Sequence, residues 1–423
     1  MTTQITSAQL DAAGEALQDV LRFEYPADSV LSNYFRMNRG VGARDRAFVA
    51  EAVYGVLRQL RQLKAIAGAD ARARKLLLAW LVRFEGYSLR QLEPMLSRGE
   101  EEWIEQMKAK LKNYKPSSLG DRTNLPDWLA KRLLAQFGEE RTLALASAFN
   151  RSAPLDIRVN PMTTERDTVL ARFAQDGVAA QAGAYSPLCI RFDSKFALQR
   201  HPLFEEGAIE VQDEGSQLLG FLVAPKRGEM VVDFCAGAGG KTLLLGAFMR
   251  STGRLYAFDV SEKRLAKAKP RLARAGLSNV HPAVIAHEND IRVKRLAGKM
   301  DRVLVDAPCS GFGTLRRNPD LKWRQTEAAV AEITLKQGSI LAGAARMVKP
   351  GGRLVYATCS LLAEENDAVV DAFLAAHPEF RQISAAEVLA QAKIPLDTGE
   401  RLRLNPLDHG TDGFFAAVME RVA

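Results

Sequence analysis

Hydrophobic residues in the first hundred positions recur at helical spacing. The clearest case is Arg46–Ala67, whose apolar side chains follow one another at intervals of three and four residues and so share one stripe of a helix. Few β-branched runs occur before Asp156. The pattern predicts an all-α N-terminal domain over residues 1–112. The apolar side chains of the clearest stripe are Val49, Val53, Val56, Leu60 and Leu63.

Turn-forming residues interrupt this helical pattern at Asn113–Asn124, which predicts a linker. A helical segment, Leu125–Asn150, follows the linker. We therefore expect residues 113–150 to form a linker and helical connection.

A short region of mixed pattern comes next. Leu155–Asn160 and Leu188–Phe192 are typical of strands, and Thr164–Asp176 between them is typical of a helix opened by a threonine cap. Together they predict a small α/β subdomain over residues 151–205.

Long apolar runs alternate with helical stretches from about Gly207 to the end of the chain. Such continuous runs are typical of parallel strands that are covered on both faces, and their alternation with helices predicts a doubly wound α/β sheet over residues 206–423. We expect Gly413–Val422 to be a last, antiparallel strand at the sheet edge. The apolar runs are Met230–Phe234, Leu255–Val260, Arg302–Asp306 and Arg353–Ala357.

Composition narrows the class of protein. The 423 residues exceed what one core holds, and 58 Lys and Arg against 50 Asp and Glu give a net charge of +8, which permits a polyanionic partner without establishing one. The four cysteines form no CxxC pair and the five histidines no HExxH spacing, so we expect no metal site. No secretory signal and no membrane-length apolar run is found, so we expect a cytoplasmic protein with reduced thiols. We also expect a monomer.

A glycine-rich loop follows the first predicted strand of the large sheet. The segment CAGAGGKT, Cys235–Thr242, joins that strand to an apolar helix, where a glycine turn lets the backbone approach a ligand. Asp259 ends the next strand about twenty residues beyond Gly239, where an acid can accept both ribose hydroxyls of a cofactor. The competing interpretation is a tight turn and an acid that only starts a helix.

Two cofactor classes compete for this loop. Gly240-Lys241-Thr242 matches the end of a P-loop, but Cys235 stands where a P-loop has its leading glycine. A nucleoside cofactor without a phosphate chain, such as S-adenosylmethionine, needs the ribose acid and no phosphate cradle. Loop length and Asp259 favour S-adenosylmethionine over an NTPase.

Two cysteines follow later strands of the same sheet. Cys309 comes shortly after Asp306 and Cys359 ends a further strand, so both should lie outside the carboxyl ends of the strands, where ligands bind. Buried structural cysteines are the competing interpretation.

A thiol at such a place suits methylation of a carbon that is not itself nucleophilic. Addition of a thiolate to C6 of a pyrimidine makes C5 enamine-like, so that C5 can take a methyl group. A cation such as Lys241 favours the thiolate, and Asp306 can hydrogen-bond the amino edge and N3 of cytosine. The residues themselves leave open which cysteine attacks.

Five sequence blocks follow one another along the chain in the order VQDEGSQL, DFCAGAGGKT, DAPCSGFGTLRRNPDLKW, YATCSLLAEEN and HGTDGFFAA. Together they resemble the Nol/Nop/Sun family of RNA cytosine-5 methyltransferases. The resemblance covers nearly all of residues 150–423 and implies a Rossmann-like, S-adenosylmethionine-dependent methyltransferase sheet preceded by a small RNA-facing α/β subdomain.

The resemblance also implies roles for the catalytic residues. Cys359 would be the nucleophile that attacks C6, and Cys309 would help to release the methylated product. Asp306 would lie by the methionine amino group and the target base, with Lys241 nearby.

Cofactor contacts follow from the same resemblance. Asp259 would bind the ribose and Asp290 would lie near the adenine. Ala238 stands where the family more often has proline, which should loosen the turn without removing a ligand. The segment implied to hold the methionine end is Cys235, Ala236, Gly237, Ala238, Gly239, Gly240 and Lys241.

The helical front is similar in part to the NusB-like domain of the bacterial members of type B, which methylate a cytosine of 16S ribosomal RNA. The match is Arg44–Leu63, RDRAFVAEAVYGVLRQLRQL, and it implies RNA binding by residues 1–112, whereas the competing interpretation is a generic helical domain. Basic Arg316, Arg317 and Lys322, beside Trp323, either face RNA or brace their loop.

We therefore expect an RNA methyltransferase that forms 5-methylcytosine in 16S rRNA and takes part in rRNA processing. The same chemistry on tRNA or another RNA is one alternative. The other is a protein without catalysis that holds RNA during ribosome assembly.

Overall fold

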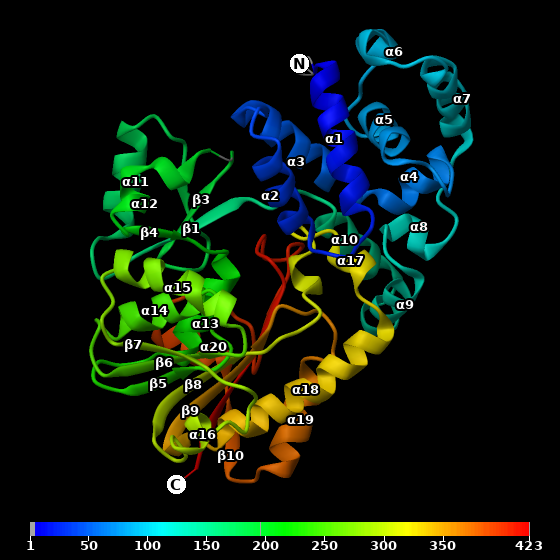
Figure 1. The fold of residues 1–423 in the computed structure, drawn as a ribbon. Helices are drawn as coiled ribbons and strands as arrows, with labels where there is room; N and C mark the ends of the chain where they lie inside the picture. Colours follow the sequence, from blue (N-terminus) through cyan, green and yellow to red (C-terminus); the bar gives the residue numbers. More distant parts are fainter. Residues whose placement is uncertain (1–4, 195, 423) are drawn as a thin grey trace. The chain divides into compact units, whose positions relative to one another are not determined.

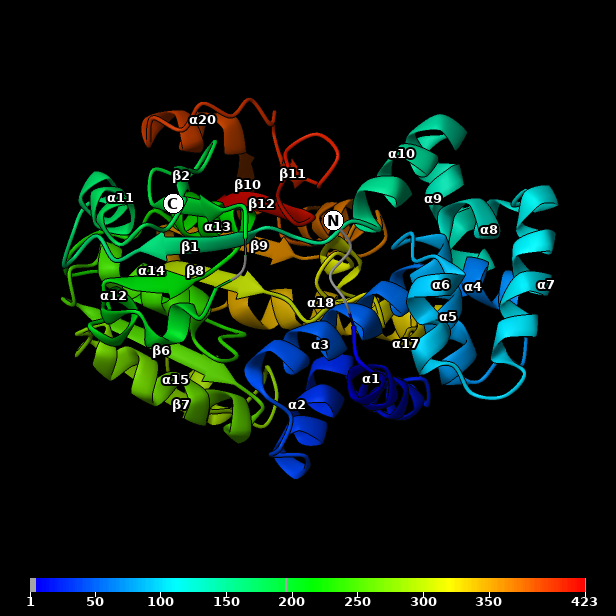
Figure 2. The same cartoon turned by 90° about the horizontal axis from the view of Figure 1, so that it is seen from above.

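The computed structural model describes residues 5–194 and 196–422. It divides into two compact units. The first, here called the helical unit, contains residues up to Ser152 together with Thr314–Glu327, and the second, here called the sheet unit, contains Ala153–Gly313 and Ala328 onward. Figure 1 labels the elements, and Figure 2 gives the view from above.

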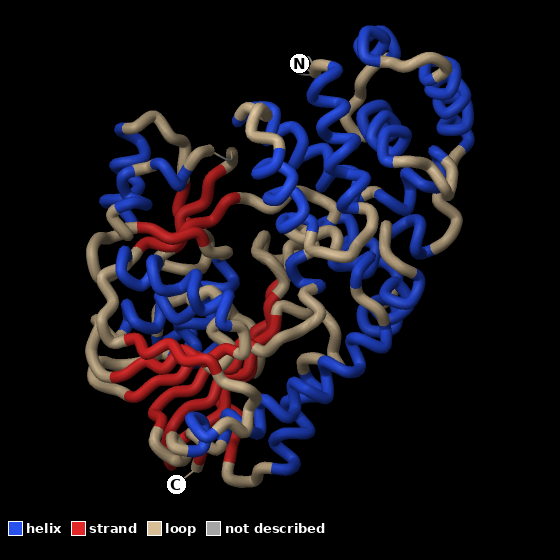
Figure 3. Tube along the Cα trace, viewed as in Figure 1, coloured by secondary structure: helices blue, strands red, loops and turns tan. Residues whose placement is uncertain are grey.

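The described residues of the helical unit form helices and loops (Figure 3), and an apolar core gathers buried side chains between Ile5 and Met107. The expectation of an all-α front is confirmed, because no strand occurs among its described residues. Its elements are α1 (Ser7–Val20), α2 (Ala27–Met37), α3 (Ala43–Arg58), α4 (Leu60–Ala67), α5 (Ala73–Arg83), α6 (Leu89–Leu92), the 3₁₀ turn η1 (Glu93–Met95), α7 (Glu100–Asn113), α8 (Leu119–Thr123), α9 (Asp127–Phe137), α10 (Glu139–Phe149) and α17 (Leu321–Arg324).

Two predictions in this unit need correction. The single helix expected at Arg46–Ala67 is two helices, α3 and α4, which break at Gln59, although all five apolar side chains of the predicted stripe are buried. The expected linker contains α8, which Arg61 holds through an ion pair of 2.6 Å between its Nε and Asp121 Oδ1. The turn-forming residues of the expected linker therefore include those that begin and end a short capped helix.

The segment Thr314–Glu327 joins the helical unit although the chain reaches it from the sheet unit. Trp323 packs against the helical core, and its indole Nε1 donates to Leu57 O over 3.1 Å. Lys322 is 2% exposed, and its ammonium donates to Arg58 O (2.9 Å) and to Asn150 Oδ1 (3.1 Å). Of the two interpretations of these residues, the structure favours bracing for Lys322.

A small antiparallel sheet opens the sheet unit, in the order β2-β3-β1-β4. Its strands β1 and β3 confirm the two predicted here, but the predicted threonine cap is wrong, because Glu165 precedes the helix and makes no side-chain cap. The elements are β1 (Leu155–Val159), α11 (Arg166–Gln175), β2 (Gln181–Ala182), β3 (Cys189–Phe192), the 3₁₀ turn η2 (Leu198–Arg200), α12 (Pro202–Glu205) and β4 (Ile209–Val211).

The large sheet follows the order β10-β12-β9-β8-β5-β6-β7, with β11 paired to β12. The four predicted apolar runs form β5, β6, β8 and β9, which pair in parallel as expected. The last strand is antiparallel but does not lie at the edge, because β10 and β11 also pair with β12. The strands are β5 (Met230–Asp233), β6 (Arg254–Asp259), β7 (Val280–Val284), β8 (Met300–Asp306), β9 (Val348–Thr358), β10 (Phe380–Ile383), β11 (Leu402–Leu404) and β12 (Phe414–Arg421).

Helices cover both faces of the large sheet (Figure 1). Successive side chains of a strand point to opposite faces, so Val231 packs with one set of helices and Val232 with the other. One face carries α13 (Glu214–Val223), α14 (Gly240–Phe248), α15 (Glu262–Arg274) and α20 (Ala385–Gln391), and the other α18 (Glu327–Ala345) and α19 (Asp367–Ala376), with α16 (Ile291–Lys294) after β7. This is the doubly wound α/β architecture that the apolar runs predict.

Within the described residues, every helix is too short or too polar to span a membrane.

Candidate active site

Strand register brings the predicted chemistry to one place. In the parallel pair of β8 and β9, Asp306 lies opposite Ala357, so the loops after both strands leave the sheet at the same level. Cys309 follows in one loop and Cys359 in the other. Adjacent parallel strands therefore place two thiols side by side that are far apart in the sequence.

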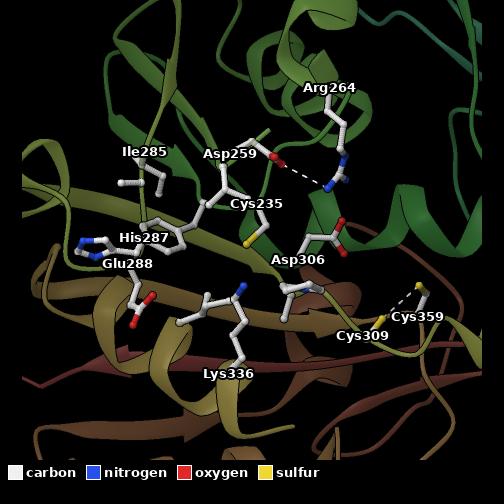
Figure 4. A pocket seen from close by; sticks show the side chains of 16 residues that line it. Cys235, Asp259, Arg264, Ile285, His287, Glu288, Asp306, Cys309, Lys336 and Cys359 are labelled. Carbon is white, nitrogen blue, oxygen red and sulfur yellow. Dashed lines mark hydrogen bonds and ion pairs between the residues drawn. The ribbon is translucent and has the colours of Figure 1, made fainter. Parts of the chain in front are cut away.

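A cavity of about 310 Å³ opens at these strand ends (Figure 4). Five of the predicted site residues line it and face into it from four different strand ends. These are Cys235, Asp259, Asp306, Cys309 and Cys359.

Glycine geometry shapes the loop after β5. Gly237 and Gly239 have backbone φ angles of +57° and +82°, which residues with a side chain rarely adopt. A Cβ on Gly239 would also come within 2.9 Å of the Ala268 Cβ. Gly239 is also the residue before α14, whose first amide groups are thus turned toward the strand ends. The predicted glycine turn is present, with Cys235 as the residue of this loop that lines the cavity.

Asp259 ties the glycine loop to the end of β6. Its Oδ2 accepts Gly237 N over 2.8 Å, its Oδ1 accepts Ser261 N over 2.8 Å, and Arg264 pairs with it at 3.6 Å. Each carboxylate oxygen has a second lone pair. Asp259 therefore positions the loop and still offers acceptors to the cavity that it lines.

Asp290 lies behind the cavity wall. Its carboxylate caps α16 by accepting a hydrogen bond from Arg292 N (2.8 Å), and it accepts another from Ala286 N (3.0 Å). These two hydrogen bonds from backbone amides, together with the nearby charge of Arg292, lower the pKa of Asp290. Ala286 itself lines the cavity. Asp290 thus shapes the wall through Ala286, and a contact with adenine stays a prediction.

Two arginines that the sequence did not indicate as part of the site hold the glycine loop by donating hydrogen bonds to its backbone carbonyls. Arg158 of β1 is 4% exposed and donates to Gly240 O over 3.0 Å and to the Gln212 side chain. Arg271 of α15 donates to Ala238 O over 2.5 Å. The small sheet therefore contacts the glycine loop directly through Arg158. The alternation of side chains along β1 puts Arg158 on the polar face of that strand but does not indicate this contact.

Asp233 and Thr242 fix the start of α14 against β5. Burial raises the pKa of Asp233 to about 7, and its Oδ2 accepts the Thr242 hydroxyl over 2.7 Å. The pair bridges the strand and the helix that flank the loop.

Lys241 and Asp306 form an ion pair beside the thiols. Lys241 Nζ lies 2.6 Å from Asp306 Oδ2, and the ammonium stands 5.7 Å from the centre of the Phe414 ring. Burial lowers the pKa of Lys241, but the charge of Asp306, its hydrogen bond and the nearby Cys359 outweigh burial, so the pKa is raised. The ammonium is thus charged at neutral pH and attracts negative charge at Cys359.

The two thiols of the site are in contact. Cys309 Sγ and Cys359 Sγ are 3.4 Å apart, and all four cysteines of the chain, which the structure describes in full, are free. The hydrogen bond with Cys359, burial, and the charges of Cys359 and Glu365 raise the pKa of Cys309 well above its ordinary value. Cys309 is therefore the protonated partner, and Cys359 is the thiol next to a cation.

Gly313 marks the point where the chain leaves the sheet unit. Its amide donates to Cys359 O (2.8 Å), its carbonyl accepts Gly413 N (2.7 Å), and a Cβ there would come within 2.1 Å of Gly413 O. Only glycine fits this approach of three strand ends, so the loop bearing Cys309 is anchored to the loop bearing Cys359.

Further residues of the cavity have no motif in the sequence. Arg264, Lys336, His287 and Glu288 line it from α15, α18 and the loop after β7 (Figure 4). Each is an ordinary surface residue type at helical or loop positions, so no pattern distinguishes it. A metal is not indicated: the described residues contain no group of three or more His, Cys, Asp or Glu suited to one.

Two family models match the chain. The model described as 16S rRNA methyltransferase RsmB/F matches residues 220–420, which include the cavity. The model described as the ferredoxin-like domain of RsmF/B-like methyltransferases matches residues 125–199, which include most of the small sheet.

Curated relatives match most of the chain. One, named probable ribosomal RNA small subunit methyltransferase B, from Synechocystis sp., is 36% identical and the alignment covers 72% of this chain and 68% of that protein. Another, named ribosomal RNA small subunit methyltransferase B, from Sodalis glossinidius, is 32% identical over 89% of this chain and 90% of that protein.

Solved structures share the fold. The crystal structure of PH0851 has a TM-score of 0.81 and 28% identity, and each chain is covered in full. A methyltransferase homolog protein from Pyrococcus horikoshii has a TM-score of 0.62 and 28% identity over 73% of this chain and all of that one.

Proposed function

This chain belongs to the RsmB/F family of 16S rRNA methyltransferases, and we propose that it forms 5-methylcytosine in 16S rRNA through Cys359. It is an S-adenosylmethionine-dependent methyltransferase with a Rossmann-like sheet. The observation that carries the proposal is the contact of 3.4 Å between the Cys309 and Cys359 sulfurs beside the Lys241–Asp306 pair.

The cavity suits the cofactor. Its volume of about 310 Å³ lies at the lower end of small-molecule sites, which span roughly 300–1,000 Å³. Asp259 keeps acceptor lone pairs for ribose hydroxyls, and Phe234, Ile285 and Ile340 offer apolar wall to a base. When bound, S-adenosylmethionine supplies an electrophilic methyl group.

Cys359 is the nucleophile in this proposal. Its thiolate forms a bond to C6 of cytosine, and the displaced electron pair makes C5 nucleophilic toward the methyl group. Loss of the C5 proton then re-forms the C5–C6 double bond, and the C6–S electron pair returns to the Cys359 sulfur. Lys241 favours the thiolate because its ammonium is held at this place by Asp306.

Cys309 and Asp306 assist the same steps. Cys309, whose raised pKa keeps its proton, hydrogen-bonds the departing Cys359 sulfur and so aids release of the product. Asp306 lines the cavity and accepts from the amino edge of the base. A cytosine must leave its stack to reach these groups, as in other enzymes that modify bases.

The test is direct analysis of the methylated RNA. Purified protein should transfer a labelled methyl group to 16S rRNA, and nucleoside mass spectrometry should identify 5-methylcytosine. Bisulfite sequencing of total RNA from cells with and without the gene should show one protected 16S cytosine that depends on it. A different methylated nucleoside would refute the chemistry, and protection only in tRNA or another RNA would refute the target.

A further inference from the structure

A buried carboxylate lies between the loops that bear the two thiols. Glu365 has no exposed surface, and it follows Cys359 by six residues in the connection between β9 and α19. It does not line the cavity, and no step of the proposed reaction uses it. A buried acid normally requires partners that satisfy its oxygens.

Those partners are the serines that directly follow each cysteine. Ser310 donates to Glu365 twice, from its amide to Oε1 (2.7 Å) and from its hydroxyl to Oε2 (2.5 Å), and the Ser360 hydroxyl donates to the same Oε2. The two hydroxyls are themselves 3.2 Å apart. One carboxylate therefore joins the residue after Cys309 to the residue after Cys359.

Further hydrogen bonds fix Glu365 and its surroundings in place. Gln337 of α18 donates its amide to Glu365 Oε1 (3.1 Å) and to Pro308 O (2.9 Å), and the Tyr356 hydroxyl of β9 donates to Glu365 O (2.7 Å). Asn366 donates to Ser360 O over 3.0 Å. Glu365 is thus held by α18 at its carboxylate and by β9 at its main-chain carbonyl, while the carboxylate holds both cysteine loops.

We propose that Glu365 is a positioning residue that registers the two cysteine loops through Ser310 and Ser360 and keeps the thiols in contact. Gly313 also joins the loops after β8 and β9, because its amide donates to Cys359 O over 2.8 Å, but Gly313 lies beyond Cys309 and Ser310 in the chain. The roles of the thiols rest on the proposed function, whereas the clamp itself does not.

The negative charge of Glu365 also acts on one thiol. It is among the causes that raise the pKa of Cys309, after the hydrogen bond with Cys359, burial and the charge of Cys359. Loosening the clamp removes the first of these causes, and neutralising the acid removes the last. Both changes make Cys309 easier to deprotonate.

The experiment compares three variants of the full chain with the wild type. Glu365→Gln keeps the shape and removes the charge, Ser310→Ala/Ser360→Ala keeps the acid and removes the hydroxyls, and Glu364→Gln is the matched control next in the chain. Iodoacetamide alkylation of Cys309 is followed against pH by peptide mass spectrometry, without RNA or cofactor. Steady-state methylation is then measured with 16S rRNA.

Both clamp variants should shift the Cys309 alkylation midpoint to lower pH. Both should also reduce kcat by about tenfold or more with KM for RNA and cofactor unchanged, because Glu365 touches neither ligand. The control should match the wild type in both measurements. If Glu365→Gln does not fold, the double serine variant decides.

An unshifted alkylation midpoint in a folded clamp variant would overturn the proposal, and so would a change confined to KM. If wild-type protein makes no 5-methylcytosine, the proposed function fails, but the alkylation profile still tests the clamp.

Discussion

One continuous sequence block, Asp301–Trp323, serves both units of this protein in different ways. Its first part ends β8 and brings Cys309 into the cavity, 3.4 Å from the second thiol. Its second part, from Thr314, belongs to the helical unit, where Lys322 and Trp323 pack among helices. The motif therefore divides at Gly313 into a part suited to chemistry and a part suited to packing.

The difference shows what a motif can and cannot indicate. Both parts contain residue types that suggest function, a cysteine in one and a lysine beside a tryptophan in the other. Burial separates them: Lys322 is 2% exposed and has a pKa lowered to about 7, chiefly because burial disfavours the charged form. A functional residue type is thus no guide to role until its partners are known.

The largest effect should come from Cys359→Ala, which removes the thiol that contacts Cys309 in the first part of the motif. Without the thiolate no covalent adduct forms at C6, so methyl transfer should fall by at least about a thousandfold, while cofactor binding measured by calorimetry persists. Cys189→Ala is the control, because Cys189 is a free, buried thiol of the small sheet. Retained activity in Cys359→Ala would assign the nucleophile elsewhere.

Cys309→Ala should slow turnover by about a hundredfold and trap the enzyme on its RNA. Adduct formation needs only Cys359, whereas release is aided by the neighbouring thiol. Denaturing gel electrophoresis with labelled RNA should therefore reveal a covalent complex that the wild type does not accumulate. A variant that turns over normally and shows no complex would make Cys309 a packing residue.

Lys241→Ala should reduce kcat by about ten- to a hundredfold, because the thiolate loses its cation and Asp306 its partner. The raised pKa of Lys241 keeps it charged well above neutral pH, so the wild-type rate should not fall through loss of this charge between pH 7 and 9. Rates across that range are the measurement, with exposed Lys299→Ala as control. Equal rates for Lys241→Ala and wild type would exclude thiolate activation by this lysine.

The smallest effect on activity, but a clear one on stability, should come from Lys322→Met. The folded-state pKa of Lys322, about 7, lies below the ordinary lysine value of 10.5, so between these pH values the unfolded chain binds a proton that the folded chain lacks. The free energy of unfolding should therefore rise with pH in this window through Lys322, and the variant should lose that part of the slope.

All four tryptophans, Trp80, Trp103, Trp128 and Trp323, lie in the helical unit, so urea unfolding followed by tryptophan fluorescence reports on it selectively. Exposed Lys112→Met is the control, and folded Lys322→Met should keep methyl transfer within about threefold. An unchanged pH slope, or an activity loss as deep as that of Cys359→Ala, would show that the two parts of the motif are not separated in role.

Much of the fold could be predicted because burial leaves a periodic record in the sequence. The strands β5, β6, β8 and β9 are covered on both faces and therefore stand out as apolar runs. Helix α3 follows from a stripe at intervals of three and four, but its end at Gln59 does not, since the stripe continues into α4. The place of β12 inside the sheet depends on β10 and β11, whose short, mixed sequences carry no comparable pattern.

The candidate site divides in the same way. The meeting of Cys309 and Cys359 follows from the rule that parallel strands present their carboxyl ends at one edge. Glu365, Arg158 and Arg271 could not be found in this way, because each acts through backbone or hydroxyl groups of another loop. Such contacts join segments that the sequence does not relate.

The sequence by itself determined the doubly wound sheet, the helical front, the glycine turn and the family, because these rest on local periodicity and contiguous motifs. Only the tertiary structure decided that Thr314–Glu327 packs in the helical unit and that Lys322 is buried there. It alone also revealed the carboxylate between the two cysteine loops. The physical reason is that burial and hydrogen-bond partners arise from long-range packing, which residue type and spacing do not encode.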